Sequence, residues 1–105
     1  MEKIVIPENI KQEIAIRIDK FNKKHRCAYI PRFKKDYLYL DRDDDVALSQ
    51  ICRLKYKGKA DDWDFAIFKY SDERYDEDEF FFPGAEHLDG TVEGAMLAGI
   101  KAYPF

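Results

Sequence analysis

Cysteine, histidine and tryptophan are scarce in this 105-residue chain, which has two cysteines, two histidines and one tryptophan. The cysteines, Cys27 and Cys52, are too few for a disulfide framework. We interpret both as small buried hydrophobic residues in a reducing compartment. No CxxC pair, HExxH helix or phosphate-binding glycine loop is present. The sequence therefore predicts no cofactor, no metal site and no recognisable catalytic motif.

Long apolar runs are also missing, and none approaches the roughly 20 residues that a membrane-spanning helix needs. Residues 1–7 lack the apolar core of a signal peptide. We therefore expect no membrane partner and a cytoplasmic location. Hydrophobic residues still make up 46% of the chain and aromatic residues 15%, which excludes a disordered protein. The length favours one domain spanning residues 1–105.

Charge is unevenly distributed along the chain. Residues 1–59 hold 15 of the 18 Lys and Arg but only 9 of the 21 Asp and Glu. The first part is therefore strongly basic and the remainder strongly acidic. This asymmetry indicates either a surface with one side suited to polyanions or ion pairs that join the two parts.

A helix is predicted over residues 7–24. Ile10, Ile14, Ile18 and Phe21 recur at helical spacing and form one apolar stripe. Pro7 suits a first helical position. The basic residues that follow Phe21 suit the negative end of the helix dipole.

Three strands are predicted next, over residues 32–41, 46–57 and 63–70, with turns between them. In the first, Leu38 and Leu40 alternate with Tyr37 and Tyr39, so leucines and tyrosines point to opposite faces. In the second, we place Ile51 on the same face as Arg53 and Lys55. The third is apolar on both faces, which is typical of a covered strand.

The closing part combines an irregular segment, residues 71–90, with a helix over residues 91–103. Phe80, Phe81 and Phe82 favour a short fourth strand or an ordered loop, because three adjacent phenylalanines need shelter from water. The helix has Asp89 or Thr91 as its expected cap. The predicted fold class is α+β, with an N-terminal helix, a three- to four-stranded antiparallel sheet and a C-terminal helix.

The last helix contains only two charged residues, Glu93 and Lys101. A helix that is apolar nearly all round must be buried on more than one side. Its second cover is the first helix, the segment containing the three phenylalanines, or another copy of the protein. The leading functional hypothesis is therefore a non-catalytic interaction domain that binds a protein partner or forms a homodimer.

An aromatic and basic sheet face gives the second hypothesis, a weak binder of single-stranded nucleic acid. Aromatic and basic side chains on an open sheet stack unpaired bases and neutralise phosphates. The same neighbours also stabilise an ordinary solvated sheet, so that reading stays open. The residues expected on this face are Tyr37, Tyr39, Arg53, Lys55, Arg32, Lys34 and Lys35.

His87 gives a third hypothesis, a small enzyme or metal-dependent protein. It lies between Glu86 and Asp89, and a histidine beside a carboxylate serves as an acid or base in many enzymes. No nucleophile or ligand set accompanies it in the sequence. An exposed loop histidine is the competing interpretation.

Two families offer resemblances. The order of predicted elements resembles that of the double-stranded-RNA-binding domain. That family carries a lysine cluster at the start of its second helix, whereas residues 89–94 contain no lysine, so the likeness is one of element order. Residues 55–58, 63–71 and 90–95 resemble small bacterial proteins sometimes labelled plasmid-related, a family without an assigned activity. That resemblance implies no functional residues.

Overall fold

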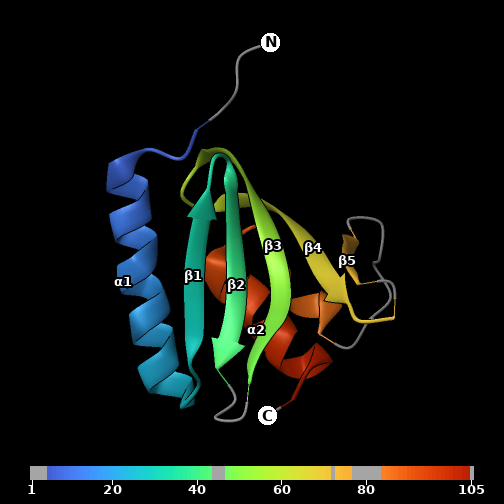
Figure 1. Cartoon of the computed structure of the whole chain (residues 1–105). Coiled ribbons are helices and arrows are strands. Elements are labelled where there is room, and N and C mark those ends of the chain that lie inside the picture. Colours follow the sequence, from blue (N-terminus) through green and yellow to red (C-terminus); the bar gives the residue numbers. More distant parts are fainter. Residues whose placement is uncertain (1–4, 44–46, 72, 77–83, 105) are drawn as a thin grey trace.

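The computed structural model describes residues 5–43, 47–71, 73–76 and 84–104 and consists of a curled sheet with helices packed against it (Figure 1). The longer helices are α1 (Glu8–His25) and α2 (Val92–Ala102), and a short 3-10 helix, η1 (Ala85–His87), precedes α2. The strands are β1 (Tyr29–Lys34), β2 (Tyr37–Asp43), β3 (Leu48–Lys59), β4 (Asp62–Lys69) and β5 (Arg74–Asp76).

The fold is α+β, as the sequence predicts, with an N-terminal helix, an antiparallel sheet and a C-terminal helix. The sheet has five strands in the order β1-β2-β3-β4-β5, rather than three or four. Every strand pairs antiparallel with the next one along the chain. The strand or ordered loop predicted for Phe80, Phe81 and Phe82 lies outside the described residues.

The prediction of one strand over residues 32–41 is wrong, because the chain reverses between β1 and β2. Lys35 has a φ of 57°, a left-handed conformation that makes the tight turn. Lys34 and Tyr37 then face each other across the hairpin. Pro31 fits because β1 is an edge strand, where a missing backbone N–H is tolerated.

A β-bulge in β3 changes which side chains face the helices. Leu40 pairs with Cys52 and Asp41 pairs with Gln50, so Ile51 is the extra residue. Ile51 is buried in the core together with Cys52, rather than lying beside Arg53 as predicted. The predicted turn at residues 41–45 also begins later, since β2 continues to Asp43.

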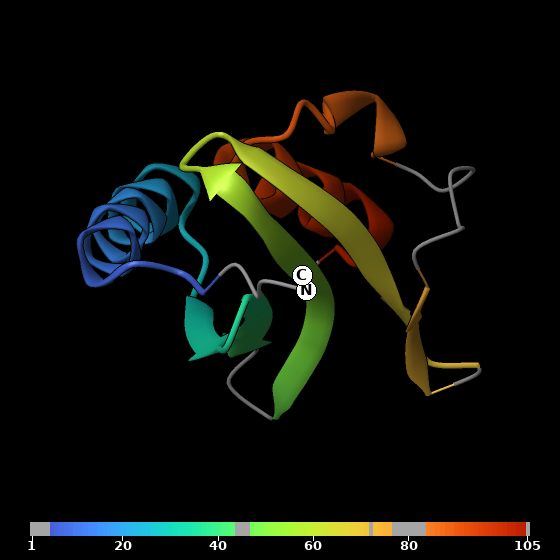
Figure 2. The same cartoon turned by 90° about the horizontal axis from the view of Figure 1, so that it is seen from above.

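The helices cover one face of the sheet, and none of the described residues forms a helix on the other face (Figure 2). Ile14, Ile18 and Phe21 of α1 are buried, as their spacing predicts. They pack with Leu38 and Leu40 of β2 in the same core cluster. In the part of the chain that the structure describes, neither helix is long and apolar enough to cross a membrane.

The small residues of α2 allow close approach by other parts of the same chain. A side chain at Gly99 would collide with the Tyr29 hydroxyl and with Ile51. A side chain at Gly94 would collide with the His87 carbonyl and the Asp89 carboxylate. The sheet and the segment before the helix therefore account for both glycines without a second copy of the protein.

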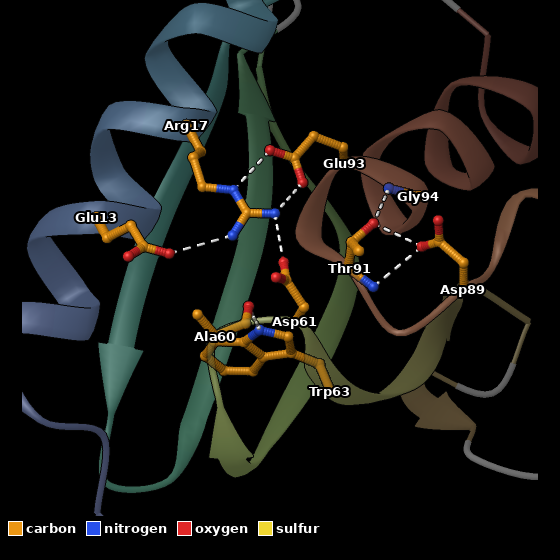
Figure 3. Close-up of polar contacts among 9 residues, drawn as sticks. All are labelled: Glu13, Arg17, Ala60, Asp61, Trp63, Asp89, Thr91, Glu93 and Gly94. Atoms are coloured by element: carbon orange, nitrogen blue, oxygen red, sulfur yellow. Dashed lines mark hydrogen bonds and ion pairs between the residues drawn. The ribbon is translucent and has the colours of Figure 1, made fainter.

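Arg17 joins α1, α2 and the β3–β4 turn (Figure 3). Its Nε and Nη2 donate to the two carboxylate oxygens of Glu93 at 2.7 and 2.5 Å, and Nη2 also donates to Asp61 at 2.7 Å. Glu13 accepts a longer bond of 3.3 Å from Nη1. The hydrogen bonds to Glu93 and Asp61 raise the pKa of Arg17, and those from Arg17 lower the pKa of Glu93. We call these four residues the Arg17 clasp.

Candidate functional site

The sheet face opposite the core gathers the aromatic and basic residues that the sequence singles out. Arg32 of β1 lies opposite Tyr39 of β2, and Tyr39 lies opposite Arg53 of β3. The next row places Lys34, Tyr37 and Lys55 side by side in the same way. Lys35 lies in the hairpin turn instead, outside both rows.

The side chains in the middle of this face form a continuous series of contacts between guanidinium groups and rings. The Arg32 guanidinium lies 4.6 Å from the centre of the Tyr39 ring. The Tyr39 ring is 5.3 Å from the Tyr75 ring. Arg53 lies 5.3 Å from the Tyr75 ring and 4.5 Å from the Tyr37 ring. We call Arg32, Tyr39, Tyr75, Arg53 and Tyr37 the ladder.

A buried carboxylate fixes the first member of the ladder. Asp41 is only 4% exposed, yet it belongs to the same face as Tyr37 and Tyr39 by alternation along β2. Its two oxygens accept hydrogen bonds from Arg32 Nε at 3.0 Å and from Nη2 at 3.4 Å. These bonds raise the pKa of Arg32. They also hold its guanidinium over Tyr39, because a planar group bonded at two points cannot turn freely.

Tyr75 is the member of the ladder that sequence reasoning missed. It lies on β5, which is only three residues long and follows a segment with no strand pattern. Its pairing with Phe68 turns the ring onto the ladder side, and the two rings are 5.0 Å apart. Burial and the nearby Asp41 charge raise the pKa of Tyr75. Alternation cannot be read from so short a strand, so the sequence held no usable signal.

The charge of this face is mainly positive. Arg32, Lys34, Arg53 and Lys55 supply cations along the two rows. Of the carboxylates there, Asp41 is bound to Arg32, and Asp64, opposite Lys55, pairs with Lys57. Such a surface attracts anionic ligands, such as the phosphate backbone of a nucleic acid.

A cavity of about 660 Å³ adjoins the ladder. Tyr37 and Arg53 line it at the ladder end, and Trp63 and Leu88 line it toward η1 and α2. Ligand sites commonly have a volume of roughly 300–1,000 Å³, so the cavity extends the usable surface of the face.

His87 lies apart from the ladder, at the end of η1. Its Nε2 is 3.8 Å from the Glu86 carboxylate, a loose contact that becomes an ion pair only if the imidazole is protonated. Within the described ranges, no group of three or more His, Cys, Asp or Glu residues is arranged to hold a metal ion. The acid–base hypothesis for His87 stays a prediction.

Fold and site together define an α+β domain that presents an aromatic and cationic sheet face on the side away from its helices. No protein-family model, curated protein or solved structure matches this chain. The two resemblances noted in the sequence therefore stay predictions.

Proposed function

We propose that the chain binds single-stranded nucleic acid through the ladder. One observation carries the proposal: Arg32 and Arg53 each lie within 4.6 Å of a tyrosine ring, on a sheet face that no helix of the described residues covers. A guanidinium group is planar, so beside a tyrosine ring it adds a second flat group on which a planar ligand can stack. Unpaired nucleic-acid bases stack on guanidinium planes and on tyrosine rings in this way.

Stacking and charge act together on such a ligand. Each stacked base contributes about 1–3 kcal/mol of binding free energy, with little dependence on sequence. Lys34 and Lys55 flank Tyr37 in the outer row, where their ammonium groups neutralise phosphates of a strand that crosses the sheet. A duplex is a poorer fit, because its stacked bases do not present their faces to a flat platform.

The hypothesis of self-association receives less support from the structure. It rests on the apolar character of α2, but the packing of Gly94 and Gly99 against Asp89, Tyr29 and Ile51 already accounts for much of that helix surface. Packing of the core, by contrast, does not explain the ladder, because the ladder residues lie on the opposite face of the sheet.

Fluorescence anisotropy of a labelled, unstructured oligonucleotide tests the proposal directly. Binding that involves four cations has a salt slope of about −3, so affinity should fall roughly fifty-fold between 50 and 200 mM salt. Lys24→Ala, which removes a cation from α1 on the helix side, serves as the control and should change affinity less than Arg32→Ala. The proposal fails if the wild-type protein gives no saturable, salt-dependent binding at 50 mM salt.

A further inference from the structure

Tyr75 occupies the centre of the ladder, although it comes from the far edge of the sheet. Strands β2 and β5 are three positions apart in the sheet order, which is about 14 Å on a flat sheet. The Tyr39 and Tyr75 rings are nevertheless only 5.3 Å apart. The sheet curls between these strands (Figure 2), and the two rings lean toward each other across it. The Tyr75 ring therefore fills a concave slot.

The walls of this slot match one flat ring. Tyr39 meets the Tyr75 ring at 64°, and Arg53 lies 5.3 Å from its centre. On the neighbouring strand, Ala66 lies opposite Arg53, so the sheet contributes only a methyl group beside the slot. A phenol ring and the six-membered ring of a pyrimidine base have closely similar size and thickness.

The rim of the slot carries donors that converge on an oxygen. Gln50 Nε2 donates to the Tyr75 hydroxyl oxygen at 3.4 Å. The Arg32 guanidinium lies near enough to that oxygen to lower the pKa of Tyr75, against the larger effect of burial. An oxygen on the edge of a bound ring therefore meets an amide and a guanidinium, neither of which can accept a hydrogen bond through these atoms.

We infer that the Tyr75 ring is an internal stand-in for a uracil or thymine base, and that single-stranded nucleic acid binds by exchanging such a base for this ring. The inference rests on the proposed function and specifies its ligand. Uracil and thymine carry carbonyl oxygens where the phenol carries its hydroxyl. Adenine is bicyclic and presents an amino group, a donor that would face other donors.

Exchange requires Tyr75 to leave, and its strand is suited to this. Strand β5 pairs with β4 through three residues at the edge of the sheet, so few backbone hydrogen bonds hold it. While the ring fills the slot, the binding-competent fraction is small and the apparent affinity is reduced by that fraction.

Titration of the full chain with oligo(dT) and oligo(dA) of equal length tests the exchange. Tyr75→Ala should bind oligo(dT) roughly tenfold more tightly than wild type, since the competing ring is gone, and should change oligo(dA) binding little. Tyr75→Phe keeps the ring without its hydrogen-bonded oxygen and should tighten oligo(dT) binding by about two- to threefold. Tyr70→Ala, which removes an exposed tyrosine outside the ladder, should leave both affinities within about twofold.

A second change tests the donor. Placing Gln50→Glu in the Tyr75→Ala background replaces the donating amide by an acceptor, and the preference for oligo(dT) should fall about tenfold. The inference is overturned if Tyr75→Ala weakens oligo(dT) binding, which would make Tyr75 a platform, or if it strengthens both oligonucleotides equally. If neither wild type nor Tyr75→Ala binds any oligonucleotide, the proposed function fails, and the inference fails with it.

Discussion

At the scale of the residue, the proposed site depends on guanidinium groups held in fixed orientations. Arg32 is held twice, by the ring of Tyr39 beneath it and by the buried carboxylate of Asp41 at 3.0 Å. Alternation along β2 predicts from the sequence that Tyr37 and Tyr39 share a face with basic neighbours. The sequence could not show that Asp41 is buried there, because the residues after it read as an acidic turn.

Asp41→Asn separates the effect of the Arg32 orientation from the effect of the negative charge on this face. The substitution removes a negative charge from the face, so simple attraction of phosphates predicts tighter binding. We expect weaker binding instead, by about two- to threefold, because Arg32 loses the charged partner that holds its guanidinium over Tyr39. Anisotropy at constant salt measures the effect, and Asp64→Asn on β4, which also removes a negative charge, is the matched control. Tighter binding by Asp41→Asn would contradict the positioning role.

At the scale of the element, the spacing of apolar residues predicts both helices but does not predict the β1–β2 hairpin. The apolar stripe of α1 and the cap of α2 follow from local chemistry, and Thr91 Oγ1 does accept the Gly94 N–H at 3.0 Å. The β1–β2 turn was missed because Lys35 adopts a left-handed conformation without the glycine or asparagine that usually marks it. The face on which Ile51 lies could not be predicted, because a β-bulge has no signature in the amino-acid sequence of β3.

The Arg17 clasp ties these elements together and predicts a pH dependence of stability. The pKa of Glu93 is lower in the folded protein than its usual value, chiefly because Arg17 donates to its carboxylate. A lowered folded-state pKa stabilises the fold above the unfolded pKa, and this contribution is lost as pH falls through the folded value. Since Glu93 and Arg17 are partly exposed, Glu93→Gln should cost about 0.5–1 kcal/mol at pH 7.

Urea denaturation at several pH values checks this prediction. The difference in unfolding free energy between wild type and Glu93→Gln should shrink as pH is lowered through the acidic range, because wild-type Glu93 then becomes neutral as well. Glu13→Gln is the control, since Glu13 is more exposed and accepts a longer bond from Arg17, so its effect should be smaller. A pH-independent difference for Glu93→Gln would contradict the clasp.

At the scale of the whole molecule, helices and ladder lie on opposite sides of one sheet. The fold class, both helices and the shared face of Tyr37 and Tyr39 could be predicted, because each depends on periodic patterns within one segment. The curl that brings Tyr75 from β5 to Tyr39 on β2 could not, because it depends on how five strands twist together. The charge asymmetry of the sequence has a physical counterpart in Arg17, a cation of the first part bound to Glu93 and Asp61 of the second.

The double substitution Arg32→Lys and Arg53→Lys tests the central claim most directly, measured as the affinity for oligo(dT) at constant salt. Lysine keeps both positive charges but has no plane on which a base can stack. We predict a loss of about tenfold in affinity with the salt dependence unchanged. Wild-type affinity in the double variant would show that charge alone explains binding and would contradict the ladder as a stacking surface.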